Sequence, residues 1–173
     1  MLHRLGYQVT SAQLTRTVAY YLERTAHGST LSEAVTAWVL ARTEPWQAWR
    51  FFLSVLESDI GDVQGGTTAE GIHLGAMAGT LDIAVLCFAG MHVHSQALRF
   101  DPALPPEVRQ LRFSVLYRGH RIEVFLSKNH MSVRSRPGRA APIKILVCGR
   151  SRELTPGGQE RFRLGNTQAP DAG

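Results

Sequence analysis

The residues with the clearest potential for chemistry lie in residues 65–80, which read GGTTAEGIHLGAMAGT. Thr67 and Thr68 offer hydroxyl donors, and Gly71 lets the backbone approach a ligand closely. His73 precedes a run of small residues that predicts a tightly packed helix, whose first turn presents unpaired N–H groups and a partial positive charge. The stretch therefore predicts an oxyanion site at a helix N-terminus. A glycine-rich turn before a buried helix, with His73 hydrogen-bonded in the core, explains the same residues without a ligand.

A second polar segment, HGSTLS at residues 27–32, also precedes a predicted helix. Ser29 and Thr30 supply two adjacent hydroxyl groups, and His27 supplies an imidazole. Thr30 with Glu33 fits a capping box, so helix capping is the structural alternative for these hydroxyls. For His27 the alternative is a buried histidine with satisfied hydrogen bonds.

Helices are expected first along the chain, because apolar residues recur there at helical spacing. The expected helices cover residues 11–24, 30–39, 43–56 and 74–89, and the last is apolar nearly all round, which predicts burial on most sides. Pro45 fits the first turn of the third helix.

Strands are expected after about Val93. Apolar and polar residues alternate from Leu111 to Tyr117, and a tight turn at 118–120 leads into a partner strand. Such alternation with short turns predicts antiparallel strands, most simply one wall of a β-sandwich. The tail from residue 151 has no periodicity and is expected to be disordered.

Composition narrows the classes of function. The formal charge is +5, but the arginines are scattered and alternate along predicted strands, which is typical of a solvated face and disfavours nucleic-acid binding. No apolar run is long enough for a membrane span, and the first ten residues do not resemble a signal peptide. Cys87 and Cys148 lie in apolar segments without metal-ligand spacing, which predicts two buried thiols in a cytoplasmic protein and no metal site.

Three stretches in this order carry a resemblance to a known family. They are YYLERTAHGSTLS at residues 20–32, GGTTAEGIHLGAMAGT followed by CFAGM at 87–91, and LRFDPALPPEVRQLRFSVLYRGHRIEV at 98–124. Together they resemble glycoside hydrolase family 65, the family of inverting disaccharide phosphorylases. The resemblance extends from about Leu5 to about Val147.

The resemblance implies an α+β chain. Residues 1–92 would form the last helices of an (α/α)6-barrel catalytic domain, and residues 93–150 an antiparallel β-sandwich C-terminal domain. The implied activity is phosphorolysis of an α-glucosyl disaccharide such as trehalose, maltose or kojibiose. Inorganic phosphate is then the co-substrate, no cofactor is needed, and the parent family is commonly dimeric.

For the site, the resemblance implies that Ser29, Thr30 and His73 bind phosphate. Thr67, Thr68 and Gly71 join them from the second loop, and His27 is a further candidate. The family's catalytic glutamate lies upstream of every matched segment, so no catalytic residue is assigned and the chain alone is expected to be inactive. The missing N-terminal part of the enzyme is then a candidate partner.

Two alternatives remain open at this point. One is a glycoside hydrolase of the same family, which needs a carboxylate base where a phosphorylase binds phosphate. The other is a non-catalytic carbohydrate-binding or scaffold module built on the β-sandwich.

Overall fold

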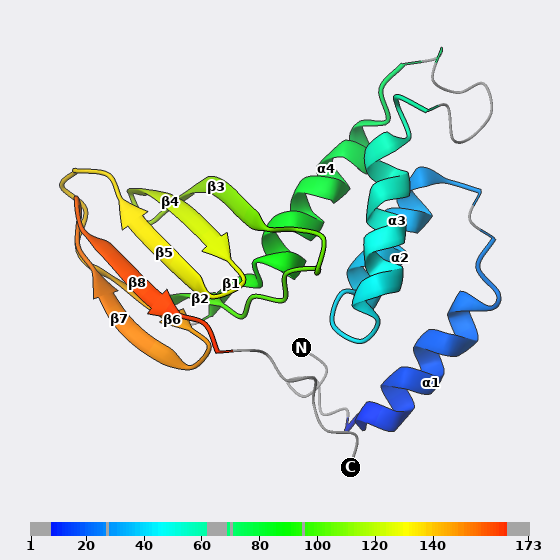
Figure 1. Ribbon diagram of the computed structural model, residues 1–173, viewed down its shortest axis with the longest axis horizontal. Coiled ribbons are helices and arrows are strands. Elements are labelled where there is room, and N and C mark those ends of the chain that lie inside the picture. Colours follow the sequence, from blue (N-terminus) through cyan, green and yellow to red (C-terminus); the bar gives the residue numbers. More distant parts are fainter. Residues whose placement is uncertain (1–7, 27, 62–68, 70, 95, 166–173) are drawn as a thin grey trace. The chain divides into compact units, whose positions relative to one another are not determined.

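The computed structural model describes residues 8–26, 28–61, 69, 71–94 and 96–165 (Figure 1). Its helices come first, and its strands follow, which confirms the α+β class. The helical elements are α1 (Ser11–Leu22), α2 (Thr30–Leu40), α3 (Pro45–Glu57), α4 (Leu74–Asp82) and the π-helix η3 (Ile83–Phe88). None of the described helices is long and apolar enough to cross a membrane.

Polar side chains cap the starts of α1 and α2, whereas α3 begins with Pro45 and has no side-chain cap. Thr10 caps α1 in a reciprocal capping box with Gln13. Ser29 caps α2, where Thr30 had been predicted to do so. The predicted capping box of Thr30 with Glu33 is wrong, because the Glu33 carboxylate instead accepts a hydrogen bond of 2.8 Å from Ser54 of α3.

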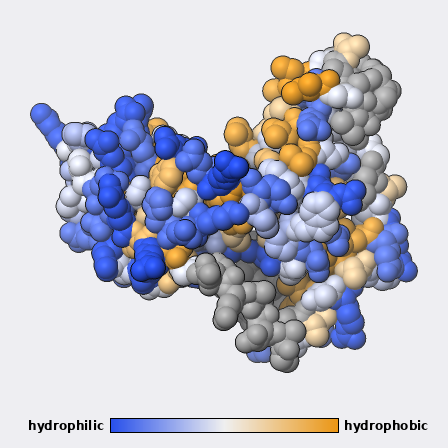
Figure 2. All heavy atoms as spheres, viewed as in Figure 1, coloured by the Kyte–Doolittle hydropathy of each residue, from blue (hydrophilic) through white to orange (hydrophobic). Residues whose placement is uncertain are grey.

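Helices α2 and α3 pack against each other as a pair (Figure 1). Their facing side chains are mostly small, and those that are fully buried include Ala34, Ala37 and Leu40 of α2 with Ala48 and Val55 of α3. Other large apolar side chains of the helices stay exposed, among them Leu31, Val35, Trp38, Val39 and Trp46. On the face shown in Figure 2, hydrophobic side chains accordingly gather over the helices, whereas the strands present a largely hydrophilic surface.

Helix α4 makes one very close contact rather than many. A Cβ atom at Gly79 would lie 3.1 Å from the Cβ of Ala34, so the glycine lets α4 approach the backbone of α2. The expectation that the helix of residues 74–89 is buried on most sides fails for its first half, because Leu74 and Leu81 are 76% and 70% exposed, and holds better for its second half, where Ile83 and Phe88 are buried. The small residues therefore serve contact on a single face.

Eight strands form two four-stranded sheets in the described part of the chain. One sheet has the order β1-β2-β6-β7 and the other the order β3-β4-β5-β8. The strands are β1 (Met91–His94), β2 (Ala97–Phe100), β3 (Gln110–Tyr117), β4 (His120–Ser127), β5 (His130–Ser135), β6 (Ile143–Val147), β7 (Arg150–Leu154) and β8 (Gln159–Arg163).

Tight turns set the register of two hairpins. Arg118 and Gly119 join β3 to β4, and Cys148 and Gly149 join β6 to β7, with all four residues at positive φ. Positive φ at both central residues is the signature of the two-residue turns that match strand twist. All sheet neighbours are antiparallel except β2 and β6, which pair in parallel, so the expectation of a wholly antiparallel sandwich is wrong for that pair.

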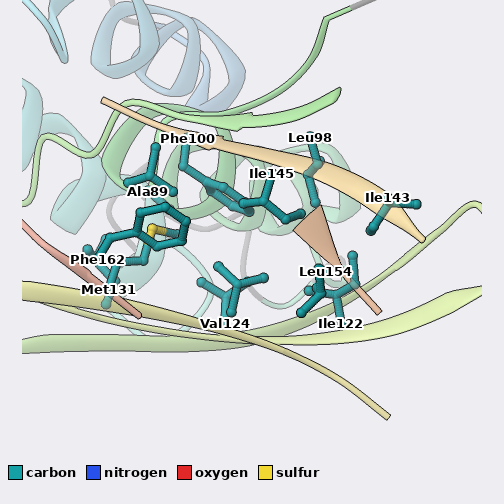
Figure 3. Packing of buried hydrophobic residues seen from close by; sticks show 13 residues of the cluster. Ala89, Leu98, Phe100, Ile122, Val124, Met131, Ile143, Ile145, Leu154 and Phe162 are labelled. Carbon is teal, nitrogen blue, oxygen red and sulfur yellow. The ribbon is translucent and has the colours of Figure 1, made fainter. Parts of the chain in front are cut away.

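The two sheets enclose one apolar core (Figure 3). Leu98, Phe100 and Ile145 from one sheet face Val124 and Met131 from the other, and all of them are almost fully buried. Alternation along β4 and β5 brings every second side chain into this core. The arginines at the intervening positions, such as Arg112, Arg121 and Arg134, are exposed, which confirms the solvated face.

Two expectations about the second half of the chain need correction. The tail from residue 151 is not wholly disordered, because β7 and β8 occupy much of it and Leu154 and Phe162 join the core. Cys148 is exposed in its turn, whereas Cys87 is buried as expected. By its internal contacts the chain divides into two compact units, residues 1–79 and 80–173.

Candidate functional site

His73 stands at the start of α4 and is held there by Asp59. The carbonyl of His73 accepts a helical hydrogen bond from the N–H of Met77 at 3.0 Å, so the residue begins the helix. Its own N–H donates to both carboxylate oxygens of Asp59, each at 3.1 Å. The ring atom Nδ1 lies 2.5 Å from Asp59 Oδ1. One carboxylate thus fixes both the backbone and the side chain of this histidine.

The protonation of this pair follows from its geometry. The hydrogen bond from the His73 side chain lowers the pKa of Asp59, partial burial opposes that change, and the backbone N–H and the histidine charge reinforce it. An ionised carboxylate can only accept hydrogen bonds, so the proton of the contact belongs to Nδ1. Within the described residues, Nε2 of His73 has no hydrogen-bond partner. This atom is therefore the one that His73 can offer to a ligand.

The start of α2 supplies hydroxyl groups. Ser29 Oγ accepts a hydrogen bond of 3.2 Å from the N–H of Leu31, which leaves its hydroxyl proton available to an anion. Ser32 Oγ donates to the carbonyl of Ser29 at 2.7 Å and braces this turn. Thr30 is only 4% exposed, whereas Ser29 is exposed. Of the two predicted hydroxyl ligands, Ser29 is thus the more accessible in this structure.

A contact between the two helix starts joins the predicted site residues. A Cβ atom at Gly75, in the first turn of α4, would lie 3.8 Å from Leu31 Cδ1 in the first turn of α2. The loops that carry His73 and Ser29 therefore lead into adjacent helix ends. Both ends orient backbone N–H groups and a partial positive charge toward their preceding loops, which favours an anion there.

Gly71 adopts a φ of +127°, and a Cβ atom there would meet nothing within 4 Å. Backbone conformation, not crowding, therefore requires glycine at this position, as the prediction for the loop assumed. His27, Thr67 and Thr68 lie outside the described residues. Their predicted roles stay predictions.

Sequence reasoning missed Asp59. The signal available was an acidic residue just past the end of a predicted helix, fourteen positions before His73, and no motif marks such a spacing. In the described part of the chain no group of three or more His, Cys, Asp or Glu side chains is placed to hold a metal ion.

A hollow of about 740 Å³ lies between α1 and α2. Its lining is mostly apolar, with Leu14, Val18, Tyr21 and Val35 among the contributing side chains. Ser29 and other hydroxyl side chains also line it, but none of the described lining residues is cationic, and a strong anion site combines hydroxyl donors with such a charge.

Two family models match the chain. The glycosyl hydrolase family 65 central catalytic domain matches residues 1–82, and the family 65 C-terminal domain matches residues 91–154.

Curated relatives agree over most of the chain. The chain is 43% identical to an uncharacterized glycosyl hydrolase of Mycobacterium tuberculosis. The alignment of 157 residues covers 91% of this chain and 12% of that protein. The chain is 31% identical to trehalose 6-phosphate phosphorylase of Lactococcus lactis, covering 95% of this chain and 21% of the relative. It is 29% identical to kojibiose phosphorylase of Escherichia coli, covering 97% of this chain and 22% of the relative. The chain thus spans less than a quarter of the length of these relatives.

A solved structure from the human microbiome, named for kojibiose phosphorylase, shares the fold. Its TM-score is 0.78 at 22% identity, over 92% of this chain and 23% of the other. The observed helices and sandwich agree with the two matched domain models, which belong to the same family. The chain therefore belongs to glycoside hydrolase family 65.

Proposed function

We propose that this chain carries the phosphate-binding part of an inverting disaccharide phosphorylase. The observation that supports it most is the arrangement of His73, whose Nδ1 is taken by Asp59 while Nε2 has no partner among the described residues. The adjoining start of α2, with the exposed Ser29, adds a hydroxyl donor and free N–H groups. Several relatives are named as phosphorylases of trehalose, trehalose 6-phosphate or kojibiose. The proposed substrates are an α-glucosyl disaccharide and inorganic phosphate.

In the proposed reaction, phosphate attacks the anomeric carbon of the glucosyl group while a carboxylic acid protonates the leaving oxygen. His73 and Ser29 hold the phosphate, together with Thr30, Thr67, Thr68 and the backbone at Gly71. The general acid is proposed to lie outside the printed sequence. The Asp59 carboxylate is no substitute, because both of its oxygens accept hydrogen bonds from His73.

Hydrolysis is the second candidate, because the relative from Mycobacterium tuberculosis is named as a glycosyl hydrolase. An inverting hydrolase needs a second carboxylate that activates water. The one carboxylate described beside His73 is engaged with that residue, which favours phosphorolysis.

Phosphate binding to the full chain tests the proposal. Inorganic phosphate should shift the amide resonances of Leu31 and His73 in a saturable titration. A charge-assisted hydrogen bond contributes about 1.5–3 kcal/mol, so His73→Ala should weaken binding by about ten- to hundredfold. His92→Ala, at an exposed position of β1, is the matched control and should bind as the wild type does. No shift at either amide in concentrated phosphate would contradict the proposal.

Turnover provides a separate prediction. The chain incubated with trehalose, maltose or kojibiose and phosphate should release no β-glucose 1-phosphate, because the general acid is not among its matched segments. A rate clearly above buffer would show that a residue of this chain serves as the acid.

A further inference from the structure

Asp59 makes hydrogen bonds to His73 that the packing of the neighbouring helices does not require. It follows Ser58, the C-cap of α3, and its carboxylate accepts hydrogen bonds from His73, the residue that directly precedes α4. Among the described residues, three hydrogen bonds end on this carboxylate, and all three come from His73. The two side chains are 15% and 27% exposed, so the pair is partly shielded while one edge of the imidazole still meets solvent.

Part of this arrangement is ordinary helix capping. A carboxylate that accepts the first N–H of a helix satisfies an orphan donor and interacts well with the helix dipole. Capping does not explain the contact with the ring, however. A cap needs only the backbone N–H, whereas Nδ1 lies closer to the carboxylate than that N–H does, at 2.5 Å against 3.1 Å.

We propose that Asp59 is a positioning residue that keeps a proton on Nδ1 of His73 and presents Nε2 to the ligand. The inference deepens the proposed function and rests on it for the identity of the ligand. With Nδ1 always protonated, the ring has two working states. The neutral ring accepts a hydrogen bond at Nε2, for example from a P–OH group, and the charged ring donates one from Nε2–H to a phosphate oxygen. Without the carboxylate, a neutral ring can also place its proton on Nε2, and the accepting state is lost in those molecules.

The tautomer of His73 is the first measurement. Ring ¹⁵N shifts of the histidine-labelled full chain, with the His73 signals assigned through His73→Gln, report which nitrogen carries the proton. In the neutral ring of the wild type, Nδ1 should be protonated and Nε2 should not. Asp59→Ala should give a mixture with a substantial Nε2–H population. A wild-type ring protonated on Nε2 alone would overturn the inference without any variant.

Phosphate affinity is the second measurement. Asp59→Asn keeps the size of the side chain but removes its charge, and we expect it to weaken binding of inorganic phosphate about tenfold. Glu33→Gln is the matched control: it makes the same chemical change on α2, where Glu33 pairs with Ser54 and not with His73. It should leave both the tautomer and the affinity unchanged.

These measurements distinguish failure of the proposed phosphate binding from failure of the positioning role of Asp59. If wild type binds phosphate and the Asp59 variants bind it equally with an unchanged tautomer, the positioning role is overturned and the proposed function stands. If wild type binds no phosphate while the tautomer still depends on Asp59, the proposed function fails and the positioning role holds.

Discussion

At the scale of single residues, ionisation of Asp59 couples the site to the stability of the helical part. The carboxylate pairs with a side chain and a backbone group that lie fourteen positions away in sequence. Loss of its charge therefore weakens the link between the end of α3 and the start of α4.

This coupling gives a prediction for acid pH. The pKa of Asp59 is lowered in the folded chain, first by the hydrogen bond from the His73 side chain. A lowered folded pKa stabilises the native state above the ordinary aspartate value of about 3.9, and the contribution disappears as the pH falls through the lowered pKa. Urea unfolding followed by helical circular dichroism should give Asp59→Asn a lower midpoint than wild type at pH 6. The two midpoints should converge near pH 2, and an equal gap at both pH values would contradict this account.

Sequence reasoning worked at residues whose role depends on neighbours in the chain. His73 was selected because it precedes a helix of small residues, and the structure places it there. Its partner was not predicted, since a contact between the ends of two helices depends on their packing. His120 is a similar case: it was assigned to a turn, yet it is buried, with Nδ1 2.8 Å from Ser135 Oγ and Nε2 2.8 Å from the carbonyl of Ala141.

At the scale of elements, glycines of α4 decide how closely it can approach α2. Gly79 faces the Cβ of Ala34, which belongs to a helix backbone and cannot rotate away. Gly75 faces the end of the flexible Leu31 side chain at an ordinary distance. The two glycines therefore form a matched pair for mutation.

Gly79→Ala should destabilise the helical part by about 1 kcal/mol. Overpacking costs roughly 1–3 kcal/mol, and the helix propensity of alanine returns up to about 1 kcal/mol. Gly75→Ala makes the same chemical change without the clash and should be neutral or slightly stabilising. Thermal unfolding of both variants checks the difference, and equal stabilities would show that α2 and α4 do not hold this close contact.

The existence of most elements could be predicted from sequence, and their pairing could not. Local periodicity indicated the helices and the β3–β4 hairpin, where a short turn fixes the register. Parallel pairing of β2 with β6 brings together strands more than forty residues apart, and no local pattern encodes it. The strands β7 and β8 were taken for a disordered tail because they show no apolar–polar alternation: three of the five residues of each are charged, and only one, Leu154 or Phe162, is a large apolar residue.

At the scale of the whole molecule, the two compact units differ in how they bury apolar surface. The strands share one core cluster, which includes Phe100, Ile122, Leu126 and Ile145 at full burial. In the helical unit no described side chain of α1 is buried.

This contrast predicts different local stabilities along the chain. Burial of a large apolar side chain contributes roughly 1.5–3 kcal/mol, and a domain has a net stability of only about 5–15 kcal/mol. Leu31, Val35, Trp38 and Trp46 are 44–62% exposed, so roughly half of that contribution is missing at each, and together the shortfall is a large fraction of a domain's net stability. We expect amide hydrogen exchange to be fast across α1 and measurably slow only where α2 and α3 face each other.

The strands and η3 should instead exchange slowly and together. Ile83, Cys87 and Phe88 of η3 are buried, and the carbonyl of Phe88 accepts a hydrogen bond of 2.9 Å from Ala103 beside the sandwich. This π-helix is therefore predicted to be the most protected helical segment, sharing the exchange rate of β4 and β5. Hydrogen exchange of the full chain read by mass spectrometry resolves these segments. Strong and uniform protection from Ser11 through Leu56 would show that the helical unit is stable by itself and would refute the prediction.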